Sequence, residues 1–322
     1  MKIVILSART GWHTDQLCRA LTARGHTGRA VLYESLVARL GSARANGDGS
    51  CADGLIGCGP DGDRVDVLEA DAVLARIIPG GSLEQVIFRV DALHWIEERG
   101  ILVVNSPRAI ERCVDKFYTS SLLLDAGLPT PATVVCQRTD DAMDAVRAMG
   151  DVVIKPIFGS LGQGMVRTDN PEVALRVVRT LDQVRAVFYV QQAIDHGGRD
   201  VRVMVVGGRA LAAIERQAPA GEWRTNVALG GTARAIDLPD AWASLAIGAA
   251  AAVGADYAGV DLLPSRDGRV FVLEVNGIPG WEGLQTATGV DVAGAIVDHA
   301  IGSIGRREAA PTGRFGTSQP TK

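Results

Sequence analysis

Two apolar runs within residues 257–276 are joined by the dipeptide Asp267-Gly268. This dipeptide between apolar segments is the strongest short-range sequence signal for a β-hairpin with a two-residue turn. A hairpin constrains the fold because it fixes which residues of the two strands face each other. In the register of a two-residue turn, Asp261 lies opposite Glu274. Like charges that face each other are destabilising, so we expect a positive charge between them.

The strand face that carries the two carboxylates also carries an amide. Asn276 follows Glu274 by two residues and projects from the same face. A solvated sheet face would carry the same polar residues, but this register also places Val272 and Leu263 there. Pro264 cannot donate a ladder hydrogen bond and can introduce a bulge. Converging oxygen donors suit a hard divalent ion such as Mg²⁺, with nucleotide phosphates completing the shell. The hairpin therefore predicts either a solvated face or a metal site beside a phosphate site.

Composition excludes several classes of protein. The 322 residues suggest two or three domains, since single cores rarely grow past about 250–300 residues. A net charge of −4 argues against nucleic-acid binding. The longest apolar stretch contains Asp256 and Asp261, so we expect no membrane span. The cysteines are odd in number and form no CxxC pair: Cys18, Cys51, Cys58, Cys113 and Cys136. We expect reduced thiols in a cytoplasmic protein, and we also expect a homo-oligomer.

The first part of the chain alternates strands and helices, which predicts an open α/β sheet. We expect strands at 2–7, 28–33, 72–78 and 101–104, and helices at 14–24, 82–100 and 108–127. Ser82 and Gln85 form a capping-box signature at the start of one of these helices. Residues 37–64 remain unassigned. No GxGxxG follows the first strand, so a nicotinamide-dependent dehydrogenase is disfavoured.

After Pro129 and Pro131 the pattern changes to shorter strands with helices between them, which predicts an α+β arrangement. We expect strands near 133–136, 152–156, 165–168, 187–191, 201–206 and 210–216, and helices near 240–253 and 291–304. The polar tail, residues 306–322, is expected to be disordered.

A candidate phosphate site lies at residues 152–165, where a strand ends at Lys155 and a loop with Gly159, Gly162 and Gly164 follows. Glycines let backbone N–H groups approach a phosphate closely. The loop is not a Walker A motif, and glycine-rich hairpins are often only flexible connections. However, the chain has four lysines among 33 basic residues, and Lys155 directly precedes this loop. Lysine acts as a compact point charge toward phosphate, which favours the phosphate site.

These motifs together resemble an ATP-grasp ligase of the RimK type over nearly the whole chain. The resemblance rests on "CVDKF", "GSLGQG", "FYVQQAI", "DVRVMVVGGRALAAIERQ", "GEWRTN" and "LEVNGIPGWEG". It implies an ATP-grasp fold, with an α/β N-terminal domain followed by two α+β lobes. The implied parts are 1–108 (N-terminal domain), 109–190 (central lobe), 191–305 (C-terminal lobe) and 306–322 (tail).

The resemblance also implies site residues for ATP and for Mg²⁺ or Mn²⁺. The expected phosphate contacts are Lys116, Lys155, Gly159, Ser160, Gly162 and Gly164, with Lys155 also near the adenine. The expected adenine and ribose contacts are Gln192, Ala193 and Asp200. Relatives often have Glu and an aromatic residue where this chain has Gln192-Ala193, a departure that backbone contacts would tolerate. The expected contacts to triphosphate and acyl phosphate are Arg224, Thr225 and Asn226. The expected metal ligands are Asp261, Glu274 and Asn276.

The implied reaction is an ATP-dependent ligation through an acyl phosphate. Arg202, Arg216 and Arg224 are candidates for binding carboxylate or acyl phosphate, although an arginine on a strand is more often part of a surface ion pair. No general base is identified from the sequence. The branch it resembles adds L-glutamate to tetrahydromethanopterin; related branches act on an F420-type flavin, a furan cofactor or a protein tail. A non-catalytic nucleotide-binding module is the other alternative, and the intact lysine and acidic residues argue against it.

Overall fold

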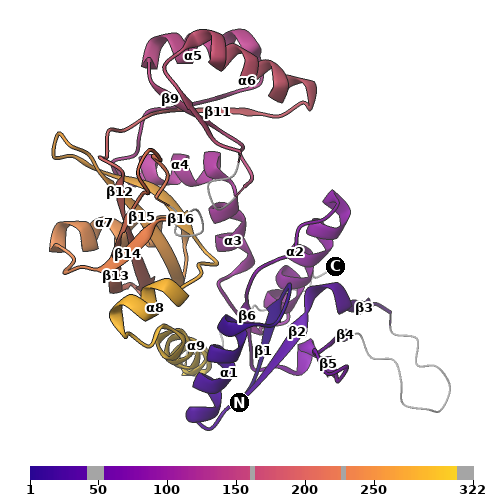
Figure 1. Ribbon diagram of the computed structural model, residues 1–322. Helices are drawn as coiled ribbons and strands as arrows, with labels where there is room; N and C mark the ends of the chain where they lie inside the picture. Colours follow the sequence, from indigo (N-terminus) through magenta and orange to yellow (C-terminus); the bar gives the residue numbers. More distant parts are fainter. Residues whose placement is uncertain (42–53, 160–163, 226–229, 310–322) are drawn as a thin grey trace, which may run out of the picture.

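The structure is a computed structural model that describes residues 1–41, 54–159, 164–225 and 230–309. The N-terminal domain contains a parallel sheet in the order β2-β1-β6-β7 (Figure 1). Its strands are β1 (Lys2–Ser7), β2 (Thr27–Leu32), β6 (Ala72–Ala75) and β7 (Leu102–Val104). Helices α1 (Trp12–Ala23) and α2 (Leu83–Glu98) cover opposite faces of this sheet. The predicted α/β rhythm and the capping box of α2 are therefore confirmed.

The unassigned segment adds a small antiparallel sheet in the order β3-β4-β5. Its strands are β3 (Val37–Arg39), β4 (Gly54–Cys58) and β5 (Arg64–Asp66), with short 3₁₀ turns η1 (Tyr33–Ser35) and η2 (Val67–Glu69) beside them. Leu55 and Val67 pack into the apolar cluster below α2, which holds this sheet to the domain.

The single helix expected at 108–127 is wrong, because the chain forms α3 (Pro107–Val114) and then α4 (Lys116–Asp125). Asp115 has an extended backbone between them, and its carboxylate accepts the N–H groups of Phe117 and Tyr118 at 2.8 and 3.0 Å. A side chain that caps a new helix satisfies N–H groups that would otherwise lack partners. The break makes Lys116 the first residue of α4.

The central lobe is an antiparallel sheet, β10-β9-β11-β8, with both of its helices on one face. The elements are β8 (Thr133–Cys136), α5 (Thr139–Met149), β9 (Val152–Lys155), β10 (Val166–Thr168), α6 (Pro171–Gln183) and β11 (Phe188–Gln192). Alternation along β11 sends Phe188 and Val190 into the core below these helices and Tyr189 and Gln191 to the other face. That other face forms one wall of the site described below.

The C-terminal lobe contains the sheet β14-β13-β12-β15-β16, with α7 (Asp240–Val253) packed on one face. The strands are β12 (Arg199–Val206), β13 (Arg209–Gln217), β14 (Thr232–Ala235), β15 (Tyr257–Pro264) and β16 (Val270–Asn276). Two further helices follow, α8 (Glu282–Thr288) and α9 (Val292–Ala309), and α9 packs against α1. Because α9 continues to Ala309, the expected disorder from residue 306 is wrong for its first residues; residues 310–322 lie outside the described part.

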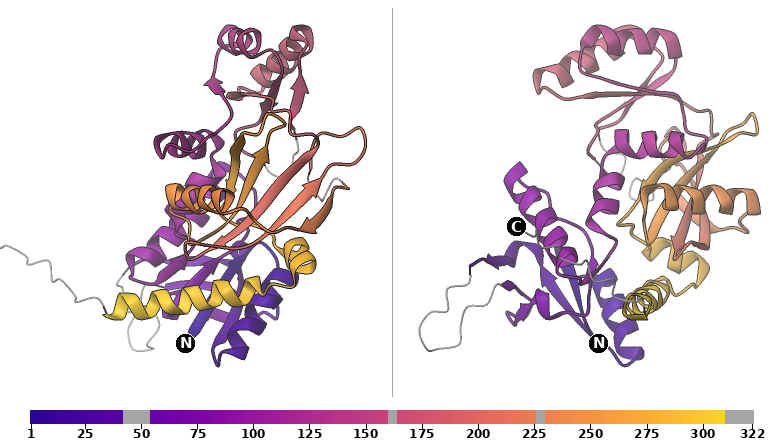
Figure 2. Two further views of the ribbon diagram at one scale, coloured as in Figure 1. Left: turned by 90° about the vertical axis from the view of Figure 1, so that its left-hand side faces the viewer. Right: turned by 180° about the vertical axis from the view of Figure 1, so that it is seen from behind.

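The C-terminal lobe lies between the other two parts of the molecule, with the central lobe at one end and the N-terminal sheets at the other (Figures 1 and 2). Buried polar contacts join the N-terminal domain to the C-terminal lobe. Asn105 donates to the carbonyls of Tyr257 and Gly277 at 2.8 and 2.5 Å. Arg76 donates to the Pro279 carbonyl at 3.0 Å and lies 4.5 Å from the ring centre of Trp281. These contacts fix the open end of the β15–β16 hairpin, where β15 begins and β16 ends. The domain boundaries expected from the sequence stay a prediction.

Two further expectations concern membrane-spanning helices and the cysteines. Within the described ranges, no helix is long and apolar enough to cross a membrane. Cys18, Cys58, Cys113 and Cys136 are free thiols, and Cys51 lies outside these ranges.

Candidate active site

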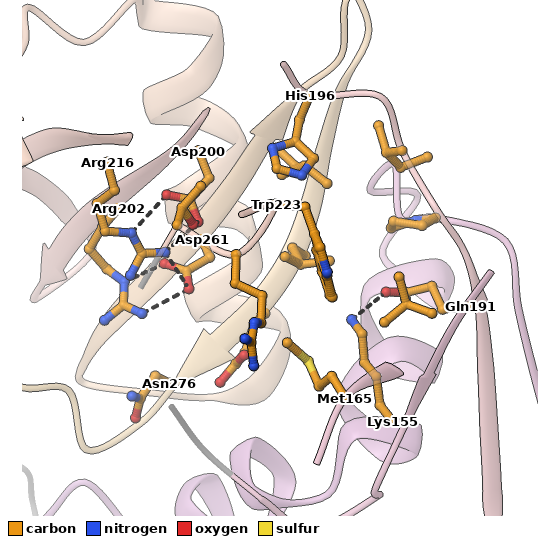
Figure 3. Close-up of a pocket in the computed structure, with 18 of the residues that line it drawn as sticks. Lys155, Met165, Gln191, His196, Asp200, Arg202, Arg216, Trp223, Asp261 and Asn276 are labelled. Carbon is orange, nitrogen blue, oxygen red and sulfur yellow. Dashed lines mark hydrogen bonds and ion pairs between the residues drawn. The ribbon is translucent and has the colours of Figure 1, made fainter. Parts of the chain in front are cut away.

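A cavity of about 330 Å³ lies between the open faces of the central and C-terminal sheets. One wall carries lysines, Lys155 at the end of β9 and Lys116 at the start of α4. The opposite wall carries a row of charged residues from four adjacent strands: Asp200 and Arg202 (β12), Arg216 (β13), Asp261 (β15) and Glu274 (β16). Trp223 and Met165 lie between the two walls (Figure 3).

The predicted pairing of Asp261 with Glu274 is confirmed, but not the turn that was expected to produce it. Ser265 N–H donates to the Arg269 carbonyl at 2.8 Å, so three residues form the turn instead of two. Gly268 has φ +87°, as the last position of such a turn requires. This longer turn shifts the register by one residue near the turn.

A β-bulge between Asp261 and Leu262 restores the predicted register at the acidic pair. Leu262 pairs with Val272 and Asp261 with Glu274, so Leu273 is the extra residue of the bulge. The expectation that Val272 shares the face of Glu274 is therefore wrong. Val272 is buried in the cluster below α7, and Leu273 lines the cavity.

The positive charge expected near the acidic pair is supplied by the protein itself. Arg202, opposite Asp261 in the β12–β15 ladder, donates to both oxygens of that carboxylate, with Nη2 at 2.8 Å from Oδ2. Arg216 Nη2 lies 3.0 Å from the same Oδ2 (Figure 3). Burial alone would raise the pKa of Asp261, but the two guanidinium groups outweigh it and hold that pKa below its usual range.

Asp200 belongs to the same network. Its carboxylate accepts two hydrogen bonds from Arg216 at 2.7 and 2.6 Å and one from Thr225 Oγ1 at 2.6 Å. Burial lowers the pKa of Arg216, but Asp261 and Asp200 act more strongly and raise it above its ordinary value. The structure therefore brings Asp200 to the cavity wall as an arginine partner, and its role toward a ribose stays a prediction.

The other expected metal ligands differ from Asp261 in their surroundings. Glu274 is half-buried and, within the described part of the chain, its carboxylate has no hydrogen bond or salt bridge. Asn276 Oδ1 accepts the N–H of Ile278 at 3.0 Å, which fixes the amide. Two carboxylates and an amide oxygen suit Mg²⁺ or Mn²⁺, so the donor set fits a hard divalent cation. No larger group of His, Cys, Asp and Glu residues that could hold a metal occurs among the described residues.

Both lysines hold their ammonium groups at the cavity. Lys155 is 8 % exposed, and its Nζ donates to Gln191 Oε1 at 2.6 Å. Burial lowers the pKa of Lys155 to about 8, against the opposing charge of Glu274. Lys116 Nζ donates to the carbonyls of Ile157 and Gly159 at 3.1 and 2.8 Å, and burial lowers its pKa as well. Lys116 is thereby tied to the start of the glycine-rich loop.

The structure describes only some of the other residues expected to contact the nucleotide. Gly159 lines the cavity and Gly164 has φ +72°, whereas Ser160, Gly162 and Asn226 lie outside the described residues. The N–H groups of Gln192 and Ala193 already donate to the carbonyls of Ala132 and Asp151 at 2.8 and 2.9 Å. The backbone N–H groups of both residues are therefore already used, and the role of these residues toward an adenine stays a prediction.

Arg224 reaches the cavity wall beside Thr225. It forms a salt bridge of 2.6 Å with Glu222, and its hydrogen bonds lower the pKa of Glu222 to about 2. Like Arg202 and Arg216, Arg224 therefore carries an acidic partner in this structure.

Several cavity residues were missed by sequence reasoning, which followed glycines and charges. Gln191 holds Lys155, and His196, 8 % exposed, lines the cavity near Trp223. The apolar lining comes from Pro131, Val153, Met165, Ile194, Leu263 and Leu273. An apolar slot that ends at lysines on one side and carboxylates on the other suits a flat base with an attached polyphosphate. This arrangement agrees with the ATP-grasp ligase that the sequence motifs predict.

Comparison with known proteins agrees with this class. The family model described as "RimK-like ATP-grasp domain" matches residues 113–300. The chain is 34 % identical over 258 residues to the tetrahydromethanopterin:alpha-L-glutamate ligase of Methanosarcina acetivorans, covering 72 % of this chain and 80 % of that protein. It is 36 % identical over 310 residues to a probable alpha-L-glutamate ligase of Trichodesmium erythraeum, covering 95 % and 98 %.

A solved structure of the ATP-grasp ligase PsnB, complexed with minimal precursor, Mg and ADP, has the same fold. The TM-score is 0.70 at 23 % identity, over 94 % of this chain and 98 % of that one. The chain belongs to the RimK-like ATP-grasp family and is an ATP-dependent carboxylate–amine ligase.

Proposed function

We propose that this ligase joins L-glutamate to a carboxylate of a small-molecule acceptor, with ATP as phosphoryl donor and an acyl phosphate as intermediate. One observation carries the proposal: the ammonium groups of Lys116 and Lys155 lie on one cavity wall, and Asp261 and Glu274 lie on the other. Phosphates fit beside the lysines, and a divalent cation fits between the phosphates and the carboxylates.

Asp261, Glu274 and Asn276 would hold Mg²⁺ or Mn²⁺, which supplies neutralisation of phosphate charge during transfer. Lys155 and Lys116 bind phosphate oxygens and keep the transferred group in place. An oxygen of the acceptor carboxylate attacks the γ-phosphorus. The bond between this phosphorus and the bridging oxygen breaks, and ADP leaves.

The second step forms the amide. The amine of L-glutamate attacks the acyl carbon, phosphate leaves, and the nitrogen loses a proton. Arg202, Arg216, Arg224 and Asn226 are the residues proposed to bind the acyl phosphate or a substrate carboxylate. A cation at Asp261 would compete with Arg202, whose guanidinium would then be available for an anionic substrate.

For the acceptor we propose a one-carbon pterin of the tetrahydromethanopterin type. The support is the name of the Methanosarcina acetivorans relative, which matches most of this chain. A furan cofactor, an F420-type flavin and a protein tail are the competing acceptors. We place the reaction in the cytoplasm, and a homo-oligomer remains our expectation for the assembly.

The test is an ADP-release assay with purified protein, Mg²⁺-ATP, L-glutamate and each acceptor in turn. The proposal requires ADP release that depends on both L-glutamate and the pterin, with a product heavier by one glutamyl residue. A product with another acceptor only would refute the pterin and leave the ligase. ATP binding without turnover on any acceptor would favour a non-catalytic module.

A further inference from the structure

Gln191 is a buried amide on the wall of the cavity, with 2 % of its surface exposed. It belongs to β11 and projects with Tyr189 away from the lobe core, where Phe188 and Val190 pack. Its Oε1 lies 2.6 Å from Lys155 Nζ on the neighbouring strand β9. No role for this residue followed from the phosphate, adenine or metal contacts above.

The surrounding hydrogen bonds fix which way the amide points. Thr133 Oγ1 donates its proton to the Pro131 carbonyl at 2.9 Å, so its oxygen accepts from Gln191 Nε2 at 3.0 Å. The Tyr189 hydroxyl oxygen accepts the second Nε2 hydrogen at 3.1 Å. With both hydrogens used, only Oε1 is directed at the ammonium group, and a flipped amide would oppose N–H groups to it.

This network also connects the two lysines. The Tyr189 hydroxyl lies 2.8 Å from Ser120 Oγ on α4, one helical turn after Lys116. Lys116 in turn donates to carbonyls just after β9. Helix α4, which carries Lys116, is thus hydrogen-bonded through Ser120 to Tyr189. Tyr189 in turn accepts a hydrogen bond from Gln191, the partner of Lys155.

We propose that Gln191 is a positioning residue that keeps the Lys155 ammonium charged and aimed at the nucleotide phosphates. The inference rests on the proposed function of this cavity. An ammonium group has three hydrogens, and Gln191 takes one of them, which leaves the others for phosphate oxygens.

A neutral acceptor suits this position better than either alternative. An apolar side chain would leave a buried ammonium without an acceptor, which favours its neutral form. A carboxylate would hold the proton more firmly but would cancel the charge and repel phosphate. The other charged groups that act on Lys155 are Glu274 from β16 and Lys116 from α4, and the Tyr189 ring centre lies 6.0 Å from Nζ.

The test compares Gln191→Leu and Gln191→Glu with wild type by calorimetric titration of Mg²⁺-ADP, without L-glutamate or acceptor. Titrations span about pH 7 to about pH 10, where the phosphates of ADP stay ionised. Gln183→Leu, at the exposed end of α6 in the same lobe, is the matched control and should equal wild type.

Gln191→Leu should weaken ADP binding by about tenfold to a hundredfold, as expected for a lost hydrogen bond to a charged group. The pH above which binding declines should fall in Gln191→Leu and rise in Gln191→Glu, because the two changes act oppositely on the lysine proton. A packing role alone would not move this pH in opposite directions.

Thr133→Val provides a second route if Gln191→Leu does not fold. It removes the acceptor that orients the amide, so it should weaken ADP binding and lower the same pH by a smaller amount. An unchanged pH profile in Gln191→Glu and Thr133→Val would overturn the inference. Failure of wild type to bind ADP would overturn both this inference and the proposed function, whereas ADP binding without ligation would overturn the function alone.

Discussion

Asp261 and Glu274 face each other as proposed metal ligands, yet the structure predicts a large stability cost for neutralising Asp261 and a small one for neutralising Glu274. Asp261 is 5 % exposed and accepts hydrogen bonds from Arg202 and Arg216. Breaking a buried ion pair by removing one partner costs about 3–5 kcal/mol. Because Asp200 still holds Arg216, we expect Asp261→Asn to lower the free energy of unfolding by about 3 kcal/mol. Glu274 has no salt bridge among the described residues, so Glu274→Gln should change it by only about 0.5 kcal/mol.

Both changes should remove the stabilisation that Mg²⁺-ADP confers. For wild type this increment follows RT ln(1 + [L]/Kd), which is about 2.7 kcal/mol at a hundredfold excess over Kd. The assay is urea unfolding of wild type and both variants, each with and without Mg²⁺-ADP. Asp267→Asn, at the exposed turn of the same hairpin, is the matched control and should keep the full increment.

Two results would refute this reasoning. A Glu274→Gln protein that keeps the Mg²⁺-dependent increment would exclude Glu274 as a ligand and favour a solvated strand face. An Asp261→Asn protein as stable as wild type without ligand would show that the two arginines do not depend on this carboxylate.

Three further outcomes follow from the same contacts. Lys155→Met should abolish ADP binding, measured by calorimetry. It should also stabilise the ligand-free protein against urea at pH 7. Burial lowers the Lys155 pKa from 10.5 to about 8, which means that burying its charge costs about 3 kcal/mol. This cost is fully present below about pH 8 and disappears as the pH rises toward 10.5, the pKa of this lysine in the unfolded chain. The stabilisation by Lys155→Met should therefore shrink in alkaline buffer. Lys155→Arg should restore ADP binding poorly. Arg202→Ala should increase the affinity for Mn²⁺ without nucleotide, measured by electron paramagnetic resonance, because the guanidinium then no longer occupies Asp261; weaker Mn²⁺ binding would mean that Arg202 supports the ligand instead. Trp281→Ala should lower the free energy of unfolding by about 3–5 kcal/mol, because this side chain is 1 % exposed and stacks on Arg76, and a change below about 1 kcal/mol would contradict that packing.

The features that the sequence predicts correctly are those set by local pattern. Strands and helices follow from the spacing of apolar residues, and the α2 capping box follows from Ser82 and Gln85. The break at Asp115 was missed because apolar spacing continues across it, although Asp before Lys-Phe-Tyr is a capping signal that could have been used.

The charge network required information that no local pattern contains. Asp261 meets Arg202 only because β15 pairs with β12, a strand that is not its neighbour in sequence. The correct pairing of Asp261 with Glu274 came from compensating errors, since a longer turn and the bulge at Leu273 cancel in register. Pro264 indicated that a bulge was possible, but the sequence did not show which residue would be the extra one, because that depends on which side chains pack into the cluster below α7.

The sequence pattern that marks the polar face of the hairpin also marks Gln191. In "FYVQQ" the alternation places Tyr189 and Gln191 on one strand face and apolar residues on the other. An amide on the strand beside one that ends in lysine indicates a binding site, as Glu274 and Asn276 do on their strand. Its partner Thr133, and Ser120, which bonds to the Tyr189 hydroxyl, come in contrast from separate elements and required the structure.

Transfer of oxygen from the acceptor to phosphate tests the central claim most directly. The acceptor is prepared with ¹⁸O in its carboxylate and incubated with the protein, Mg²⁺-ATP and L-glutamate, and the released phosphate is analysed by mass spectrometry. Ligation through an acyl phosphate predicts ADP, an amide product and one ¹⁸O atom in each phosphate released. Unlabelled phosphate alongside amide product, or AMP with pyrophosphate, would contradict it.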